Sequence, residues 1–319
     1  MPARSKTFQR ELEAAIADPN LARALERALS TFRERREQAF AGLDFAAMRQ
    51  DLRRRKEDAI ARLPELIEQF TREAEAIGAQ VYLARTPEEA CAIVRDIAVR
   101  HGVRLAVKTK SMATEEIRLN RALEQAGIQV VESDLGEWII QLAGEHPSHL
   151  IAPAIHKSRE EIAALFSRLL GREIPPDPPE LVAVARQELR RFFIEAGMGI
   201  TGANAAVAET GTLVIVTNEG NAELVTTLPP VHVAVLGVEK IVPTLDDVTA
   251  MLRLLPRSGT AQKLTVRVSF ITGPSRTSDI ELTPVRGAHG PKELHIVLLD
   301  NGRLAAREDP ELVDALYCI

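Results

Sequence analysis

The sequence predicts an α/β fold, in which a mainly parallel sheet is flanked by helices. Short apolar runs alternate with helical runs between residues 79 and 303, and this alternation is typical of parallel strands joined by helical crossovers. A highly charged stretch with helical periodicity occupies residues 7–77 and predicts an N-terminal arm. We therefore expect one α/β domain preceded by helices.

The N-terminal arm is expected to be helical because its apolar residues recur every three or four positions. Leu21, Leu25 and Leu29 follow this spacing. Asp44 is placed to cap a second helical run, and Pro64 to break or restart a helix. No chemistry is visible in this segment, so we expect it to pack on the main domain or on another subunit.

Strands and helices can be assigned in turn along the α/β segment. The motifs Thr86–Glu89 and Ser158–Glu161 are capping boxes that mark helix starts, and Thr244 marks another. Further helices are expected near residues 115–126 and around Trp138. The predicted strands cover residues 79–84, 104–108, 128–133, 149–153, 213–216, 231–237, 263–271 and 294–303, the last ending in a turn. The strand at 263–271 is expected to be half-buried, with one face formed by Leu264, Val266, Val268 and Phe270.

Composition narrows the classes of protein. The net charge is −5, which gives no global basic field for nucleic acid, and the hydrophobic content of 45% is ordinary for a soluble protein. No apolar run approaches the roughly 18 residues that a membrane span needs. The charged N-terminus lacks the apolar core of a secretory signal, so we expect a cytoplasmic protein. Two cysteines cannot build a disulfide framework or a four-cysteine metal site.

The stretch GITGANAAVAETGTLVIVTNEGN, residues 199–221, is predicted to be the centre of a binding site. Polar loops bracket one short apolar strand, and glycine allows close backbone approach while asparagine tolerates left-handed conformations. The alternative is a strand between two tight turns. The candidate binding residues here are Thr201, Gly202, Asn204, Thr210, Gly211, Asn218, Glu219, Gly220 and Asn221, and Glu209 is a candidate catalytic carboxylate.

A second candidate is the segment Lys108–Met112, between a predicted strand and a helix. Lys108, Lys110 and Ser111 offer two ammonium groups and a hydroxyl beside a helix N-terminus, which suits a carboxylate or a phosphate. The alternative is a strand end with solvated lysines and a serine cap.

Three histidines fall within the segment HPSHLIAPAIH: His146, His149 and His156. Their spacing matches no known zinc signature. A proton donor or acceptor near a substrate hydroxyl, such as His149, is the functional interpretation. Hydrogen bonding to the backbone is the structural one.

A third polar cluster follows the strand at 263–271. Arg276 is placed to clamp a carboxylate between Ser275 and Thr277, with Asp279 to orient it, and His289 follows in a glycine-framed loop. The alternative is an Arg–Asp pair that stiffens a loop. The chain lacks a P-loop, a G-x-G-x-x-G motif after a strand and a G-x-S-x-G elbow, which disfavours ATP-dependent and α/β-hydrolase chemistry.

Four long segments resemble the LUD domain of the lactate-utilization protein B family. They are residues 108–166, residues 199–221, GPSRTSDIE and GAHGPKELHIVLLDNGR, and the resemblance runs from about residue 60 to residue 317. It implies a NagB/RpiA/CoA-transferase-like fold. It also implies membership of a bacterial three-protein system that oxidises L-lactate to pyruvate and passes electrons through iron–sulfur clusters.

The chain departs from that family in its cysteines. Family members continue into a ferredoxin-like region whose C-x-x-C-x-x-C-x-x-x-C-P runs hold two [4Fe–4S] clusters. Here only Cys318 matches, as the first ligand of such a run, and it is a metal ligand only if the run continues. We expect a truncated form, or a partner that supplies the clusters; a flavin or a nicotinamide is left open. The expected domains are the arm (1–77), the LUD domain (78–303) and the start of a truncated linker or ferredoxin-like region (304–319).

The combined hypothesis is a component of a lactate-oxidising oxidoreductase that binds a small 2-hydroxy or 2-oxo acid. Lys108, Lys110 and Arg276 would hold the carboxylate, and Glu209 or His149 would accept the hydroxyl proton, with His156 nearby. The expected partners are other lactate-utilization subunits, with no nucleic acid and no membrane span. The alternatives are a non-catalytic scaffold that docks redox partners, or a CoA-transferase or sugar-phosphate-like enzyme that uses Glu209.

Overall fold

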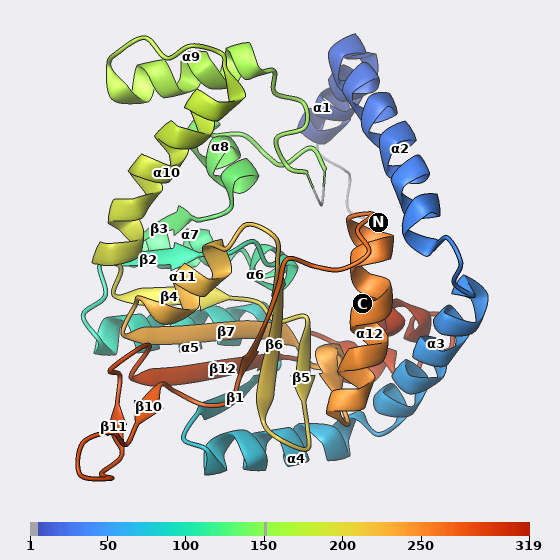
Figure 1. Cartoon of the computed structure of the whole chain (residues 1–319), viewed down its shortest axis with the longest axis vertical. Coiled ribbons are helices and arrows are strands. Elements are labelled where there is room, and N and C mark those ends of the chain that lie inside the picture. Colours follow the sequence, from blue (N-terminus) through green and yellow to red (C-terminus); the bar gives the residue numbers. More distant parts are fainter. Residues whose placement is uncertain (1–5, 150–151) are drawn as a thin grey trace.

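A sheet of six parallel strands forms the centre of the protein in the computed structural model, which describes residues 6–149 and 152–319 (Figure 1). In sheet order the strands are β1 (Gln80–Ala84), β12 (Glu293–Leu299), β7 (Val231–Gly237), β4 (Met198–Thr201), β2 (Leu105–Lys108) and β3 (Gln129–Glu132). Every residue of β7 is buried, as expected for a strand covered on both faces. The predicted α/β class with a mainly parallel sheet is confirmed.

Helices cover both faces of this sheet. One face packs on α5 (Pro87–Arg100) and α7 (Leu119–Gln125) through buried side chains such as Val94 and Leu123. The other face packs on α4 (Leu63–Ala76) through Phe70, and on α10 (Pro178–Glu195) through Phe193. The remaining helices on that side are α8 (Leu135–Ala143), α9 (Arg159–Leu170) and α11 (Asn221–Thr227). Alternate residues of each strand face opposite sides, so each strand contributes to both clusters.

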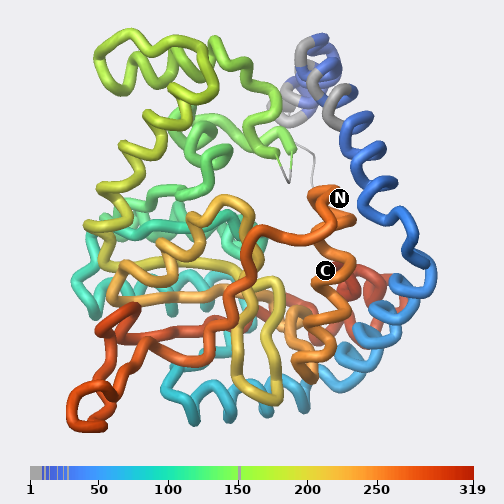
Figure 2. Tube along the Cα trace, in the orientation of Figure 1, coloured from blue at the N-terminus to red at the C-terminus, as the bar shows by residue number. Residues whose placement is uncertain are grey.

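A second, four-stranded sheet stands beside the first. Its order is β8 (Ile241–Val242), β5 (Ala205–Val207), β6 (Thr212–Thr217) and β9 (Arg267–Ile271). It packs against α3 (Phe45–Ala61) and α12 (Leu245–Gly259) through Leu52, Val248 and Met251. Figure 2 shows the chain leaving α12, passing along β9 and reaching the ribbon of β10 (Arg276–Thr277) and β11 (Val285–Arg286) at the lower left.

The expected N-terminal helices are present as α1 (Lys6–Ala17), α2 (Pro19–Phe40), α3 and α4. Asp44 caps α3, since its Oδ1 accepts from the backbone N–H of Ala47 at 2.9 Å. Basic side chains of α3 bind the body of the protein: Arg55 contacts Asp247 at 2.8 Å. The short helices are α6 (Met112–Glu116) and α13 (Arg303–Ala306), with 3₁₀ turns at Val238–Lys240 and Val313–Tyr317. Among the helices that the structure describes, none has the length and apolar character to cross a membrane.

Three local expectations need correction. The helix expected at 115–126 is divided into α6 and α7, because Arg118 between them has a left-handed backbone with φ of 54°. The strand expected at 149–153 lies partly outside the described residues, and the described positions 149, 152 and 153 are not in a strand. The strand expected at 263–271 begins only at Arg267, and its apolar face is largely exposed, with Leu264 74% and Phe270 51% exposed. The physical reason is that β9 is an edge strand, paired with β6 alone.

The turn between β5 and β6 depends on a glycine. Gly211 has φ of +64°, and a Cβ there would lie 2.4 Å from the backbone nitrogen of Ala74 in α4. We expect Gly211→Ala to lower the free energy of unfolding by about 2–3 kcal/mol, from backbone strain and overpacking together. Urea denaturation would measure the loss. Gly102→Ala is the matched control, because φ there is +62° but nothing lies within 4 Å; equal losses in both variants would contradict the packing argument.

Candidate functional site at the carboxyl edge of the sheet

Polar side chains gather where β2, β3 and β4 end. In parallel α/β sheets this carboxyl edge is the usual place for a ligand. The β5–β6 hairpin brings the loop before β5 and the loop after β6 to the same region: Asn204 donates its backbone N–H to the Val214 carbonyl at 2.8 Å, and Asn204 Oδ1 accepts from the backbone N–H of Val216 at 2.8 Å. The polar loops around residues 201–204 and 217–221 are therefore neighbours.

Lys108 ends β2 inside a closed set of partners. Its side chain has no exposed area, and its Nζ lies 2.9 Å from Glu132 Oε1, 3.0 Å from Glu115 Oε1 and 3.2 Å from Thr114 Oγ1. Asn120 also donates to Glu132 Oε1, at 2.6 Å. Burial alone would lower the pKa of Lys108, and the two carboxylates outweigh it, so this pKa lies above its ordinary value.

Lys108 is therefore a structural cation and does not present its ammonium group to a ligand. Two carboxylates already compensate its charge, and the group has no solvent-facing surface. The expectation that it holds a substrate carboxylate is not supported by this geometry. Glu132 becomes the partner of Lys108 because β2 and β3 pair side by side, and this pairing is decided by the tertiary structure.

A second set of charged side chains lies beyond the end of β2, around Lys110. Lys110 Nζ is 2.9 Å from Glu137 Oε1 in α8, and both side chains are largely buried. Glu219, in the loop after β6, reaches the start of α8, where its Oε2 lies 3.4 Å from the backbone nitrogen of Leu135. Asp134 precedes α8 and lies among these groups.

Asp134 has the most informative pKa in this cluster. Burial and the negative charges of Glu219 and Glu137 raise the pKa of Asp134 to about 6, while Lys110 and a hydrogen bond from Asn221 oppose the shift. A carboxyl group with a pKa near neutrality can both accept and return a proton. Asp134, Glu137 and Glu132 were not among the predicted site residues. The letters E-S-D at residues 132–134, where the predicted strand 128–133 ends, are a signal that could have found Glu132 and Asp134.

Asn221 and Ser111 join the loops at this edge. Asn221 Nδ2 donates to Ser133 Oγ at 3.2 Å. Asn221 follows Gly220, whose left-handed φ of 82° favours glycine at this position. Gly202 lies against Ser111, since a Cβ on it would come within 2.7 Å of Ser111 Oγ. These contacts connect the ends of β2, β3, β4 and β6.

Thr201 and Asn218 have internal partners. Thr201 is fully buried, and its Oγ1 is 2.8 Å from Nε2 of the buried His232. Burial lowers the pKa of His232 to about 3, so this ring is neutral. Asn218 Oδ1 accepts from the backbone N–H of Val266 at 3.1 Å and fixes the start of β9.

Glu209 and Thr210 lie at the other end of the β5–β6 hairpin, beside Gly211. Glu209 is exposed, and its Oε1 accepts from the backbone N–H of Leu245 at 2.8 Å, at the start of α12. Thr210 Oγ1 donates to Thr212 Oγ1 at 2.8 Å. The structure therefore gives Glu209 a helix-capping contact and separates it along the hairpin from the Asn204 end.

The predicted histidines lie in the loop after α8. His149 Nδ1 accepts from the backbone N–H of Ala152 at 3.2 Å. His156 contacts Ser148 Oγ at 2.6 Å and Glu145 Oε2 at 2.9 Å, and Lys157 shares Glu145 at 2.6 Å. The ring of His149 thus has the backbone contact of the structural interpretation, and the ring of His156 has side-chain partners.

The predicted arginine cluster lies at the opposite edge of the sheet. Gly273 lies against Ile77, which precedes β1, and Ser275 pairs with Pro291, which precedes β12. Arg276 is exposed on the β10–β11 ribbon beside Thr277, whose hydroxyl donates to Asp279 at 2.5 Å. His289 is exposed in the same region. Parallel strands begin at this edge and end at the edge where Lys110 lies, so Arg276 and Lys110 are on opposite sides of the sheet. The geometry therefore does not support the prediction that Lys108, Lys110 and Arg276 together hold one carboxylate.

The cysteines of the chain do not fit an iron–sulfur cluster by themselves. A [4Fe–4S] cluster takes four thiolates, and the sequence has two cysteines. Cys91 lies on α5 and donates to the Ile117 carbonyl, and burial raises the pKa of its thiol, whereas Cys318 is exposed.

Comparison with known proteins assigns the family. The LUD domain model matches residues 67–299, which is most of the chain. The chain belongs to the LUD domain family. Its β1–β12 sheet and the carboxyl-edge cluster lie inside the matched region.

Three relatives illustrate the similarity. Lactate utilization protein B of Bacillus pumilus is 39% identical over 94% of this chain and 62% of its own length. The protein of the same name from Oceanobacillus iheyensis is 43% identical over 79% of this chain and 51% of its own length. The uncharacterized electron transport protein YkgF of Escherichia coli is 38% identical over 98% of this chain and 64% of its own length. The chain thus spans about half to two thirds of these relatives.

A solved structure is also similar. It is a DUF162 family protein from Deinococcus radiodurans, with 15% sequence identity and a TM-score of 0.39, and the match covers 74% of this chain and 98% of that one.

Proposed function

We propose that this LUD-family chain is the substrate-binding part of a system that oxidises L-lactate to pyruvate. The relatives named lactate utilization protein B, 39% and 43% identical, support the lactate part of this proposal. The observation in the structure that carries the chemistry is Asp134, a carboxyl group with a pKa of about 6 beside Lys110. A cytoplasmic location, other lactate-utilization subunits as partners, and the scaffold role stay predictions.

The proposed reaction needs a base and an electron acceptor. Oxidation of a 2-hydroxy acid removes the hydroxyl proton and a hydride from C2, so the acceptor must take two electrons together with the C2 hydrogen. Asp134 would take the hydroxyl proton, because its pKa allows it to bind a proton near neutral pH. A hydride acceptor outside these residues, such as a flavin or a nicotinamide, would take the C2 hydride, release its proton to solvent and pass the two electrons to iron–sulfur clusters. Those clusters would also lie outside these residues, since the two cysteines cannot supply four thiolates.

The charge balance constrains how an acid could bind. Lys110 lies near Glu137 and Asp134, and Glu219 lies near Asp134, so the cluster is net negative when all the carboxyls are ionised. An anionic substrate is therefore expected to bind when Lys110 leaves Glu137 for the substrate carboxylate. Protonation of Asp134 would reduce the repulsion, so binding should strengthen as the pH falls toward 6.

Titration calorimetry with pyruvate and with L-lactate tests this proposal. We expect Lys110→Gln to weaken binding of both acids at least about tenfold, because a charge-assisted hydrogen bond is worth about 1.5–3 kcal/mol. The matched control is Lys157→Gln: Lys157 pairs with Glu145 at 2.6 Å and is 16% exposed, against 20% for Lys110. This control should bind like the wild type.

Two results would overturn the assignment. Equal affinities in Lys110→Gln and the wild type would remove Lys110 from the site. No binding of either acid by the wild type, together with binding of a partner subunit, would favour the scaffold role instead.

A further inference from the structure

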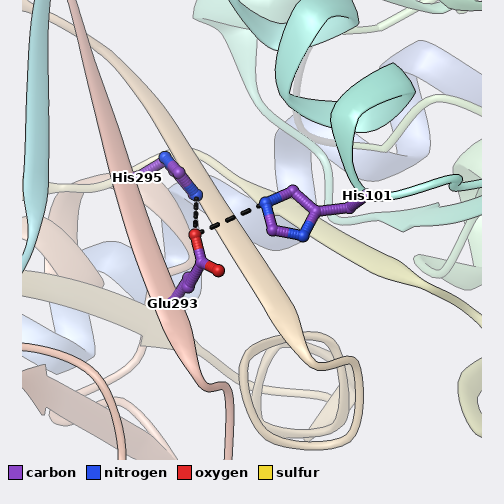
Figure 3. A group of neighbouring side chains, drawn as sticks. All are labelled: His101, Glu293 and His295. Carbon is purple, nitrogen blue, oxygen red and sulfur yellow. Dashed lines mark hydrogen bonds and ion pairs between the residues drawn. The ribbon is translucent and has the colours of Figure 1, made fainter.

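A cluster of two histidines and a glutamate lies at the edge of the sheet opposite the candidate site. Glu293 Oε2 is 3.1 Å from His295 Nε2 and 3.4 Å from His101 Nε2, and one potential ligand atom from each residue lies within 4.8 Å of the others. Figure 3 shows both imidazole rings directed at the same carboxylate oxygen. All three side chains converge on one point.

Regular elements hold these three residues in place. Glu293 and His295 are two positions apart at the start of β12, so they lie on the same face of the strand. His101 is the C-cap of α5, the helix that packs on that face. The C-terminal end of a helix favours a positive charge. The site is therefore built by a strand and a helix end rather than by a mobile loop.

Two of the three separations match those of a tetrahedral zinc site, and the third, between the two histidine nitrogens, is within 4.8 Å. Zn–N and Zn–O bonds of about 2.0–2.1 Å at tetrahedral angles place neighbouring ligand atoms about 3.3 Å apart. The glutamate oxygen is 3.1 Å and 3.4 Å from the two imidazole nitrogens. Two histidines and one carboxylate form a ligand set that zinc uses, with the fourth position left open.

A relay of hydrogen bonds behind the cluster supports the same conclusion. His295 Nδ1 is 3.2 Å from Tyr82 Oη, Tyr82 Oη donates to Gln80 Oε1 at 3.1 Å, and Gln80 Nε2 donates to Glu293 Oε2 at 3.2 Å. Because the Tyr82 proton points to Gln80, Tyr82 Oη accepts from Nδ1–H of His295. This assignment leaves a lone pair on His295 Nε2, as metal ligation requires.

The lone pair on His295 Nε2 then faces a carboxylate oxygen 3.1 Å away. Two acceptors at this distance repel each other unless a second proton or a metal ion lies between them. His295 has no exposed side-chain area, and a buried, unpaired contact of this kind is costly. A cation at this position would satisfy all the groups at once.

The open side of the cluster faces a pocket. This pocket has a volume of about 310 Å³ and is lined by His101, Arg104, Glu195, Lys292 and Glu293, among others. Arg104 and Lys292 are cationic, so they weaken the attraction of the pocket for a bare metal ion and favour an anion or a hydroxide as its fourth ligand.

We propose that His101, Glu293 and His295 form a binding site for a divalent transition-metal ion, with Zn²⁺ as the ion that these ligands fit best. Zinc would bind to Nε2 of both histidines and to the glutamate carboxylate. Tyr82 and Gln80 would act as positioning residues that fix the tautomer of His295 and the orientation of Glu293. This site is independent of the lactate proposal, since the two lie at opposite edges of the sheet.

The test is competition for Zn²⁺ with a chromophoric chelator, using the full chain without a histidine tag. We expect one equivalent of Zn²⁺ to bind. His101→Ala and Glu293→Gln should each weaken binding more than about tenfold, and Tyr82→Phe by about tenfold. His101 and Glu293 are chosen because their side chains are 26% and 35% exposed, which reduces the risk of misfolding compared with the buried His295.

Two controls separate this site from other metal-binding groups. His146→Ala removes an exposed histidine elsewhere, and Cys318→Ser removes the exposed thiol; both should keep wild-type affinity. Co²⁺ bound to the wild type should show the visible absorption of a tetrahedral ion, and His101→Ala should lose it. Zn²⁺ should also raise the Tm of the wild type more than that of His101→Ala.

The outcomes are decisive in either direction. Absence of binding by the wild type would mean that a proton occupies the gap between His295 and Glu293, and would overturn the proposal. Wild-type affinity in both His101→Ala and Glu293→Gln would also overturn it. Selective loss in these two variants, with folded circular dichroism spectra, would establish the site.

Discussion

Replacing Lys108 by methionine is expected to lower the free energy of unfolding by about 3–5 kcal/mol. The substitution keeps the volume of the side chain but removes the ammonium group from Glu132, whose side chain is only 6% exposed. An uncompensated carboxylate would then remain buried beside Glu115. Urea denaturation of the purified variant measures the loss.

Two further variants make the interpretation of Lys108 specific. Lys157→Met removes a lysine that pairs with Glu145, which is 40% exposed, and it should cost at most about 1 kcal/mol. The double variant Lys108→Met/Glu132→Gln should recover part of the loss, because it no longer buries an unpaired charge. If Lys108→Met is no more destabilising than Lys157→Met, Lys108 is not a structural cation.

Replacing Asp134 by asparagine is expected to change how stability depends on pH. In the folded protein the pKa of Asp134 is raised from 3.8 to about 6. The folded state therefore binds more protons than the unfolded state between about pH 4 and pH 6, and the contribution of Asp134 to stability falls as the pH rises through this window. The total is about 3 kcal/mol, from roughly two pH units at about 1.4 kcal/mol each.

The measurement is the difference in unfolding free energy between the wild type and Asp134→Asn at several pH values. In this difference the contributions of the other titratable groups to the pH dependence cancel. The variant should gain about 3 kcal/mol relative to the wild type between pH 4 and pH 7. Asp279→Asn, on the exposed β10–β11 connection, is the control and should follow the wild-type profile. A constant difference across this range would mean that Asp134 has no raised pKa.

Local signals in the sequence were sufficient for most of the elements. Asp44 and Thr86 cap their helices as predicted, and Ser158 with Glu161 forms a complete capping box. These contacts span three residues, so the local sequence specifies them. The single helix expected at 115–126 was wrong because Arg118 adopts a left-handed backbone conformation, and a non-glycine residue in this conformation has no reliable local signal in the sequence.

The candidate site was predictable only in part. The loops at 201–204 and 217–221 were expected to meet, and an antiparallel hairpin brings them together. Lys108 was expected to face a ligand, and the neighbouring strand supplied Glu132 instead. Arg276 was expected beside the lysines, and the chain carries it to the other edge of the sheet.

The sequence alone determined the fold class, the helix starts and the family. Alternation of apolar runs, caps and long motifs are properties of neighbouring residues, and they need no knowledge of the final packing. Only the tertiary structure decided which charges meet. Lys108 with Glu132, Asp134 with Glu219, and His101 with Glu293 are each brought together by strand order and helix packing. Electrostatic energy depends on distance and burial, and both are set by the fold.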